Sequence, residues 1–204
     1  MPPSALVTAI GTYGHTKALK DGAFKPKRVE LNYVEVSPII AAFRRMVRGL
    51  EFDVSELAIS TYLCARAFGK PFTAIPVFPV RAFHHGAIVY NSKSGIKGPG
   101  DLVGRKVGVN RGYTVTTGLW VRGILQSEYG VDPNKVTWVL SGDEHVQEWK
   151  APANVVSAPQ GADLAKMLVA GEIDAAIGVG SVDSPDVKPL IPDARNAGYA
   201  SFKK

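Results

Sequence analysis

The residues best suited to chemistry lie together in the segment 74–90, AIPVFPVRAFHHGAIVY. This segment contains Arg81, His84 and His85, which are one permanent cation and two of the four histidines in the chain. A guanidinium can bind a carboxylate through two parallel hydrogen bonds, and imidazole gains or loses a proton near neutral pH. We therefore predict that Arg81 anchors an anionic substrate and that the histidines transfer protons.

Strand geometry would divide these three side chains between two faces. In an extended segment, Arg81 and His85 point to one side and His84 points to the other. Arg81 and His85 are therefore the leading pair of candidate catalytic residues, and His84 is the second choice.

Further candidates lie where helices are expected to begin, because the free amide hydrogens of a helix start attract anions. His15 is added because it follows the first expected strand, where α/β folds place ligand-facing loops. Capping or surface roles remain open for all of them. The candidate substrate-binding residues are Ser60, Thr61, Arg111, Tyr113, Thr114, Thr116 and His15.

The elements that must position these residues alternate between strands and helices. Strands are expected at 5–10, 29–36, 52–57, 106–109, 136–140 and 173–179, and helices near 15–21, 38–48, 60–68, 114–129 and 164–170. Ser37 with Pro38 is expected to start the second helix, and Gly130 and Gly171 to end the last two. Segments 141–161 and 181–204 show no clear periodicity. This order favours an α/β fold with mostly parallel sheets.

Composition excludes several classes of protein. The 204 residues are 46% hydrophobic and 21% charged, which is typical of a globular chain. The net charge of +6 is scattered, which favours small anionic molecules over nucleic acid as partners. The single cysteine, Cys64, excludes an internal disulfide and is expected to be buried in a helix.

Missing motifs narrow the class further. There is no leader segment and no run of eighteen apolar residues, so we expect a cytoplasmic protein without a membrane partner. No phosphate-binding loop, dinucleotide fingerprint or strong metal-ligand spacing is present, even around His145, so neither cofactor nor metal is expected. Trp120 and Trp138 are expected in the core, and Glu56 is either a base or a paired structural carboxylate.

The arrangement of two α/β lobes joined near 81–91 resembles the type II periplasmic-binding-protein fold, in which ligand lies in the cleft between lobes. The segments LVGRKVGV and AGEIDAAIGV look like the opening and closing pieces of the second lobe. More narrowly, residues 51–91 and the segment GLWVRGILQSEYGVDP resemble the 4,5-dihydroxyphthalate decarboxylase family.

This resemblance implies a first lobe at 1–86, a second lobe at 87–182 and a return segment or tail at 183–204. Members of the family are usually longer, so it also implies that the first lobe is incomplete. The implied activity is release of carbon dioxide from a hydroxylated aromatic dicarboxylate, without a cofactor. Such a site needs cations, a base for the hydroxyl group and an acid for the ring carbon. Arg81 would hold a carboxylate, and which of His84 and His85 is acid and which is base stays open.

Two other functions are compatible with the sequence. One is a solute-binding protein of an uptake system that captures a small anionic or nitrogenous ligand without catalysis, because this fold is widely used for binding. The other is an incomplete paralogue without activity. The oligomeric state and the exact substrate are left open by the sequence.

Overall fold

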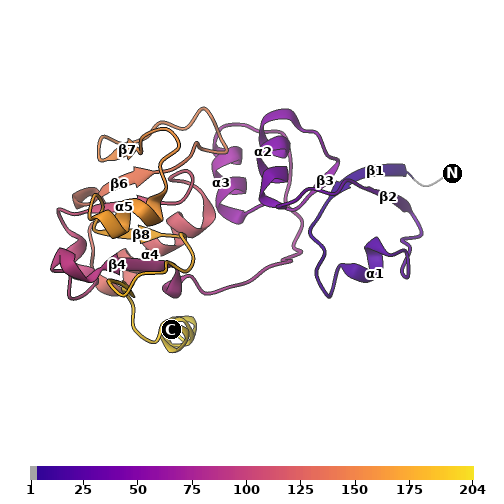
Figure 1. Cartoon of the computed structure of the whole chain (residues 1–204). Coiled ribbons are helices and arrows are strands. Elements are labelled where there is room, and N and C mark those ends of the chain that lie inside the picture. The colour runs from indigo at the N-terminus through magenta and orange to yellow at the C-terminus, as the bar shows by residue number, and fades with distance from the viewer. Residues whose placement is uncertain (1–3) are drawn as a thin grey trace. The chain divides into compact units, whose positions relative to one another are not determined.

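The computed structural model describes residues 4–204 and divides into two compact units. The first unit ends at Arg81 and the second runs from Ala82 to Lys204 (Figure 1). Each unit has its own sheet, and five of the seven strand pairs in the described residues are parallel. The α/β class with mostly parallel sheets is therefore confirmed, whereas the cleft between lobes and the boundaries at residues 86 and 182 stay predictions.

The first unit is built on a three-stranded parallel sheet of order β2-β1-β3. Its elements are β1 (Ser4–Ala9), α1 (Lys17–Lys20), β2 (Val29–Tyr33), α2 (Ile40–Gly49), β3 (Val54–Ser55) and α3 (Ile59–Ala67). A small core forms where α2 places Ala42 and Met46 against Ala9 and Phe52. Helix α2 also buries Phe43 and Val47, so its buried residues form one apolar face.

The start of α2 differs from the prediction. The helix begins at Ile40 with Ile39 at the N-cap, and no side chain caps it. Pro38 instead precedes the helix in a turn, in which its carbonyl oxygen accepts a hydrogen bond from the amide of Ala41 at 2.9 Å. Ser37 is thus not the capping residue.

The second unit is built on a six-stranded sheet of order β7-β6-β5-β8-β4-β9. Strand β4 is antiparallel to both of its neighbours, and the other pairs are parallel. Its strands are β4 (Ile88–Asn91), β5 (Lys106–Val109), β6 (Thr137–Leu140), β7 (Val155–Ser157), β8 (Ala175–Ile177) and β9 (Val187–Pro189). Its α-helices are α4 (Thr116–Tyr129), α5 (Leu164–Ala170) and α6 (Ala194–Phe202), with 3-10 turns at His85–Ala87, Ser92–Ser94, Pro99–Leu102 and Pro133–Lys135.

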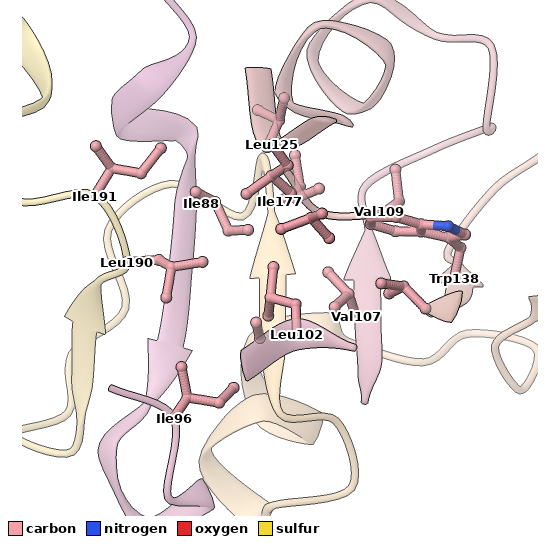
Figure 2. Packing of buried hydrophobic residues seen from close by; sticks show 14 of the residues in the cluster. Ile88, Ile96, Leu102, Val107, Val109, Leu125, Trp138, Ile177, Leu190 and Ile191 are labelled. Atoms are coloured by element: carbon pink, nitrogen blue, oxygen red, sulfur yellow. The ribbon is translucent and has the colours of Figure 1, made fainter. Parts of the chain in front are cut away.

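Helices cover both faces of this sheet, as the alternation of side chains along β8 requires. Ala175 and Ile177 face the larger core, which includes Leu125 of α4, the fully buried Trp138 and the side chains drawn in Figure 2. Ala176 faces the opposite core with Leu168 of α5. A strand that is buried on both faces has a continuous run of apolar residues. This run is why a strand could be predicted in the segment 173–179, where the structure has β8.

Three elements of the second unit lie in segments without periodicity. Strands β7 and β9 are three-residue strands at the two edges of the sheet, and α6 contains Gly198 and has no side-chain cap. Their positions depend on pairing with distant segments rather than on local pattern. Helix α4 also starts two residues later than predicted, at Thr116.

Two predictions about single residues are corrected. Cys64 lies in α3 as predicted but is only partly buried. Trp120 is 44% exposed on α4, so only Trp138 of the two tryptophans belongs to the core. Across residues 4–204, every helix is too short or too polar to cross a membrane.

Gly198 is the tightest point between α6 and the rest of its unit. A Cβ atom there would lie 2.6 Å from Cγ of Phe83, whose ring also packs on Tyr199 with 5.1 Å between centroids. We expect Gly198→Ala to reduce the free energy of unfolding by about 1–3 kcal/mol, because α6 or Phe83 must shift. Limited proteolysis of the C-terminal helix and urea unfolding measure this loss.

Gly123 of α4 supplies the matched control. It is exposed and a Cβ atom there would meet nothing within 4 Å. Gly123→Ala should therefore stabilise the unit by roughly 0.5–1 kcal/mol through helix propensity alone. Equal effects of the two substitutions would contradict the packing of α6 on Phe83.

Candidate functional site

Three parallel strands of the second unit end side by side and bring three loops together. Val109 of β5 is paired with Leu140 of β6 and with Ile177 of β8. The next residues, Asn110 and Ser141, are therefore neighbours: the Ser141 hydroxyl donates to Oδ1 of Asn110 at 3.4 Å. In open α/β sheets, this carboxyl edge is where ligands bind.

A cavity of about 230 Å³ opens at this edge. Its wall is formed by the residues after the three strands and by the first turn of α5, namely Asn110, Ser141, Ala162, Asp163, Leu164, Ala165 and Val179. The carboxylate of Asp163 accepts the amides of Ala165 and Lys166 through Oδ1 at the start of α5. The polar side chains of the cavity wall are therefore the amide of Asn110, the hydroxyl of Ser141 and the carboxylate of Asp163.

Arg111 follows Asn110 in a strained backbone conformation. Its φ of 74° lies in the left-handed region, which long side chains rarely adopt. The amide of Arg111 donates to the Ser141 hydroxyl at 3.0 Å, which ties the two loops together. Strain of this kind concentrates at ligand sites, so it supports the prediction that Arg111 belongs to one.

The loop before α4 holds an internal carboxylate. Glu144 accepts hydrogen bonds from the amide of Tyr113, from the amide of Thr114 at 3.0 Å and from the Thr114 hydroxyl. These are the donors that were predicted to bind substrate. Thr116, the first residue of the helix, is half-buried.

A stack of rings and a guanidinium lies beneath this loop. Arg122 is 7% exposed, and its Cζ lies 3.4 Å from the ring centroid of Tyr113, which in turn stacks on Trp149. Burial lowers the pKa of Arg122 to about 10, although the Tyr113 and Glu144 charges oppose the shift. Arg122 thus stays charged at neutral pH.

The two histidines of the segment 74–90 lie in different environments. His85 is 3% exposed, and its Nε2 lies 3.1 Å from Oε1 of Glu128, which also accepts a hydrogen bond from Ser201. Burial raises the pKa of Glu128, and the hydrogen bonds from Ser201 and His85 lower it. The lowering is the larger effect, so the pKa of Glu128 lies below its usual value. His85 therefore ties α4 and α6 to the start of β4.

His84 is half-buried and lies parallel to the Trp120 ring, with 6.4 Å between centroids and 2° between planes. Burial, followed by the charge of His85, lowers the pKa of His84 below its ordinary value. The imidazole of His84 is thus neutral at neutral pH, as a general base must be.

The alternation argument that paired Arg81 with His85 does not apply to this segment. His85 begins a 3-10 turn, and β4 starts only at Ile88. Arg81 is exposed and, within residues 4–204, has no hydrogen-bond or ion-pair partner.

The first unit also has a polar edge after its strands. Glu56 accepts the amide of Gly11 at 3.0 Å and the Tyr13 hydroxyl at 2.8 Å. Burial and the hydrogen bond and charge of Glu56 raise the pKa of Tyr13 to about 12. Glu56 is thus a paired structural carboxylate, and the exposed His15 stacks on Tyr13.

Ser60 and Thr61 lie in the first turn of α3 rather than at its cap, which is Ala58. Both are buried, and the Ser60 Oγ has no hydrogen-bond partner among the described residues. A buried hydroxyl without a partner is costly, so it marks a position where a ligand or water atom would be stabilising.

Asn110, Ser141, Glu144 and the exposed Trp120 were not predicted as site residues. Asn110 and Ser141 each follow a predicted strand, so the carboxyl-edge rule that selected His15 could have found them. Glu144 lies thirty residues from Thr114, and no local pattern links the two. Among residues 4–204, no group of three His, Cys, Asp or Glu side chains is placed to hold a metal ion.

Solved structures define the class to which this fold belongs. The chain matches an alkanesulfonate-binding protein SsuA from Xanthomonas axonopodis pv. citri with a TM-score of 0.53 and 17% identity, over 93% of this chain and 61% of that one. It matches the periplasmic aliphatic sulphonate binding protein SsuA from Escherichia coli with a TM-score of 0.56 and 16% identity, over 98% of this chain and 69% of that one. The chain therefore has a periplasmic-binding-protein-like fold.

Sequence comparison gives the family. The chain is 35% identical to a 4,5-dihydroxyphthalate decarboxylase of Comamonas testosteroni over 212 residues, which cover 98% of this chain and 64% of that protein. It is 36% identical to a 4,5-dihydroxyphthalate decarboxylase of Pseudomonas putida over 181 residues, which cover 85% of this chain and 69% of that protein. No protein-family model matches the chain. The chain belongs to the 4,5-dihydroxyphthalate decarboxylase family and spans less than two thirds of the length of the first of these relatives.

The lowered pKa of His84 predicts a pH-dependent stability. As pH falls below the ordinary value of 6.5, the unfolded chain binds a proton that folded His84 resists. The contribution of neutral His84 is therefore complete above pH 6.5 and declines as pH falls toward the folded-state pKa. We expect His84→Gln to flatten this part of the stability profile, measured by urea unfolding from about pH 5 to about pH 8.

His15→Gln removes an exposed histidine of the first unit and serves as control. It should leave the slope of the second unit's unfolding transition as it is in the parent chain. A His84→Gln profile that parallels the parent at every pH would refute the assignment of a buried, neutral imidazole.

Proposed function

We propose that this chain is a decarboxylase that acts on a hydroxylated aromatic carboxylate. This is the class of reaction that the names of its two relatives state. The observation that carries the proposal is its 35–36% identity to two 4,5-dihydroxyphthalate decarboxylases over most of its length. The fold by itself supports binding as well as catalysis, so the chemistry must rest on particular side chains.

The reaction sets clear demands on the site. In 4,5-dihydroxyphthalate, a hydroxyl group lies para to a carboxylate, and ionising that hydroxyl makes the ring carbon bearing the carboxylate electron-rich. A proton added to this carbon replaces the carboxylate, which leaves as carbon dioxide while the ring regains aromaticity. The site must therefore bind carboxylate, accept the hydroxyl proton and deliver a proton to carbon.

His84 is the better candidate for the base. Its lowered pKa keeps the imidazole neutral, and its side chain is half-buried beside the exposed Trp120. Trp120 and His84 present parallel aromatic faces, which suit a substrate that is itself a planar ring. His85 is engaged by Glu128, so we assign it the role of holding this segment against α4.

Arg81 and Ser60 are the candidates for carboxylate binding in the first unit. Within residues 4–204, Arg81 offers an exposed guanidinium without a hydrogen-bond or ion-pair partner, and Ser60 offers a buried hydroxyl without a hydrogen-bond partner. In the second unit, Asn110, Ser141 and Arg111 supply neutral donors and a cation at the carboxyl edge. We further propose that the protein acts in the cytoplasm, that it requires no cofactor, and that its ligand is a small molecule rather than nucleic acid or membrane.

The purified chain incubated with 4,5-dihydroxyphthalate should release carbon dioxide and form 3,4-dihydroxybenzoate in equal amounts. Product is followed by chromatography and carbon dioxide by a coupled assay. Phthalate without the hydroxyl groups is the matched control, because it lacks the para hydroxyl that the mechanism uses. Saturable binding of the dihydroxy compound without turnover would replace the enzyme by a binding protein.

Replacing Arg81 by Ala should weaken substrate binding by roughly 10–100-fold, because a charged hydrogen bond to carboxylate contributes about 1.5–3 kcal/mol. The effect should fall mainly on KM, or on the dissociation constant measured by calorimetry. Arg28→Ala removes an exposed arginine of the same unit and should leave both values unchanged. Parent-like values for Arg81→Ala would remove Arg81 from the site.

A further inference from the structure

The loop that leads into α4 already holds a carboxylate. Two amides, from Tyr113 and Thr114, and the Thr114 hydroxyl all donate to the side chain of Glu144. These donors immediately precede the N-cap of the fourteen-residue helix α4, so the partial positive charge of the helix dipole lies next to them. Backbone amides that converge in this way form sites for anions.

Arg122 adds a buried positive charge beside these donors. Its Nη2 donates to the carbonyl oxygen of Tyr113 at 2.6 Å, and the charge of Glu144 counteracts the effect of burial on the pKa of Arg122. The side chain is 7% exposed, and its Nη1 has no hydrogen-bond partner within the part of the chain that the structure describes. An unsatisfied buried guanidinium is costly unless an anion lies nearby.

The segment that follows Glu144 is packed against the rest of the unit. His145 and Val146 are 2% and 0% exposed. Trp149 stacks on Tyr113 with 5.4 Å between ring centroids. These packed neighbours hold the backbone of Glu144 next to the loop that leads into α4.

We propose that the loop that leads into α4 is a carboxylate-binding site and that the chain fills it with its own Glu144. The anion of a ligand is therefore excluded from Tyr113 and Thr114 and must bind elsewhere, which makes Glu144 a determinant of specificity. Only this last consequence rests on the proposed decarboxylase function. The carboxylate site itself does not.

Removing the side chain should expose the site to small carboxylates. In Glu144→Ala, the amides, the Thr114 hydroxyl and Arg122 would surround a vacant space of carboxylate size. We expect this variant to be less stable than the parent and to regain several degrees of melting temperature in sodium formate or acetate. Sodium chloride at equal ionic strength controls for screening, and the parent chain controls for general salt effects.

Two further variants sharpen the test. Adding Thr114→Val to Glu144→Ala removes one donor and should weaken the response to formate. Glu172→Ala removes an exposed glutamate and should show no response beyond that of the parent. Equal shifts in formate and chloride, or equal shifts in Glu144→Ala and the parent, would overturn the proposal.

If Glu144→Ala does not fold alone, the same comparison is made by refolding from urea and measuring circular dichroism. Recovery of native signal in formate but not in chloride supports the site. Recovery in both salts, or in neither, overturns it. These experiments measure stability and not turnover. A negative result would therefore contradict the carboxylate site without bearing on the decarboxylase activity, and the absence of activity would not contradict the carboxylate site.

Discussion

The parallel ladder of β6, β5 and β8 is the constraint on which the second unit depends. Its register places Val109, Leu140 and Ile177 at one level, so the loops that follow must meet. Helix α5 approaches this ladder closely, since a Cβ atom at Gly108 of β5 would lie 3.1 Å from Cδ2 of Leu164. A shift of one residue in this register would separate Asn110 from Ser141 and exchange the side chains that the shifted strand presents to the two cores.

Each unit uses an internal carboxylate to hold the loop after a strand. In the first unit, Glu56 binds the amide of Gly11 and the hydroxyl of Tyr13. In the second, Glu144 binds the amides of Tyr113 and Thr114. A carboxylate can accept several hydrogen bonds at once, so one side chain can satisfy a loop that has no ladder partners.

Local signals in the sequence predicted the elements whose ends are marked and whose cores are apolar. Lys106–Val109 and the ends of α4 and α5 at Gly130 and Gly171 agree with the structure, because both glycines adopt positive φ as C-caps. The strand β9 was not predictable, because its pairing with β4 links residues nearly a hundred positions apart. The pairing of Arg81 with His85 by alternation failed because a 3-10 turn, which leaves no mark in the pattern, begins at His85.

Candidate residues were easier to predict by type than by role. The segment with Arg81, His84 and His85 was identified by its chemistry, yet burial separates the two histidines in a way that adjacent positions cannot reveal. His85 is enclosed and lies within hydrogen-bond distance of Glu128, whereas His84 is half-buried and has a lowered pKa. Such a division follows from what each ring meets after folding, and it depends on Glu128 and Trp120 of α4.

The groups left without internal partners show where an anionic ligand would be most stabilising. Glu56 and Glu144 use the loop donors of their own units, so those donors contribute little to binding a second carboxylate. Among the described residues, the buried groups without a hydrogen-bond partner include the Ser60 hydroxyl of the first unit and Nη1 of Arg122 in the second, and Arg81 is exposed without a partner. Because uncompensated donors and cations gain most from an added anion, these are the positions, each within its own unit, at which an added carboxylate would be most stabilising.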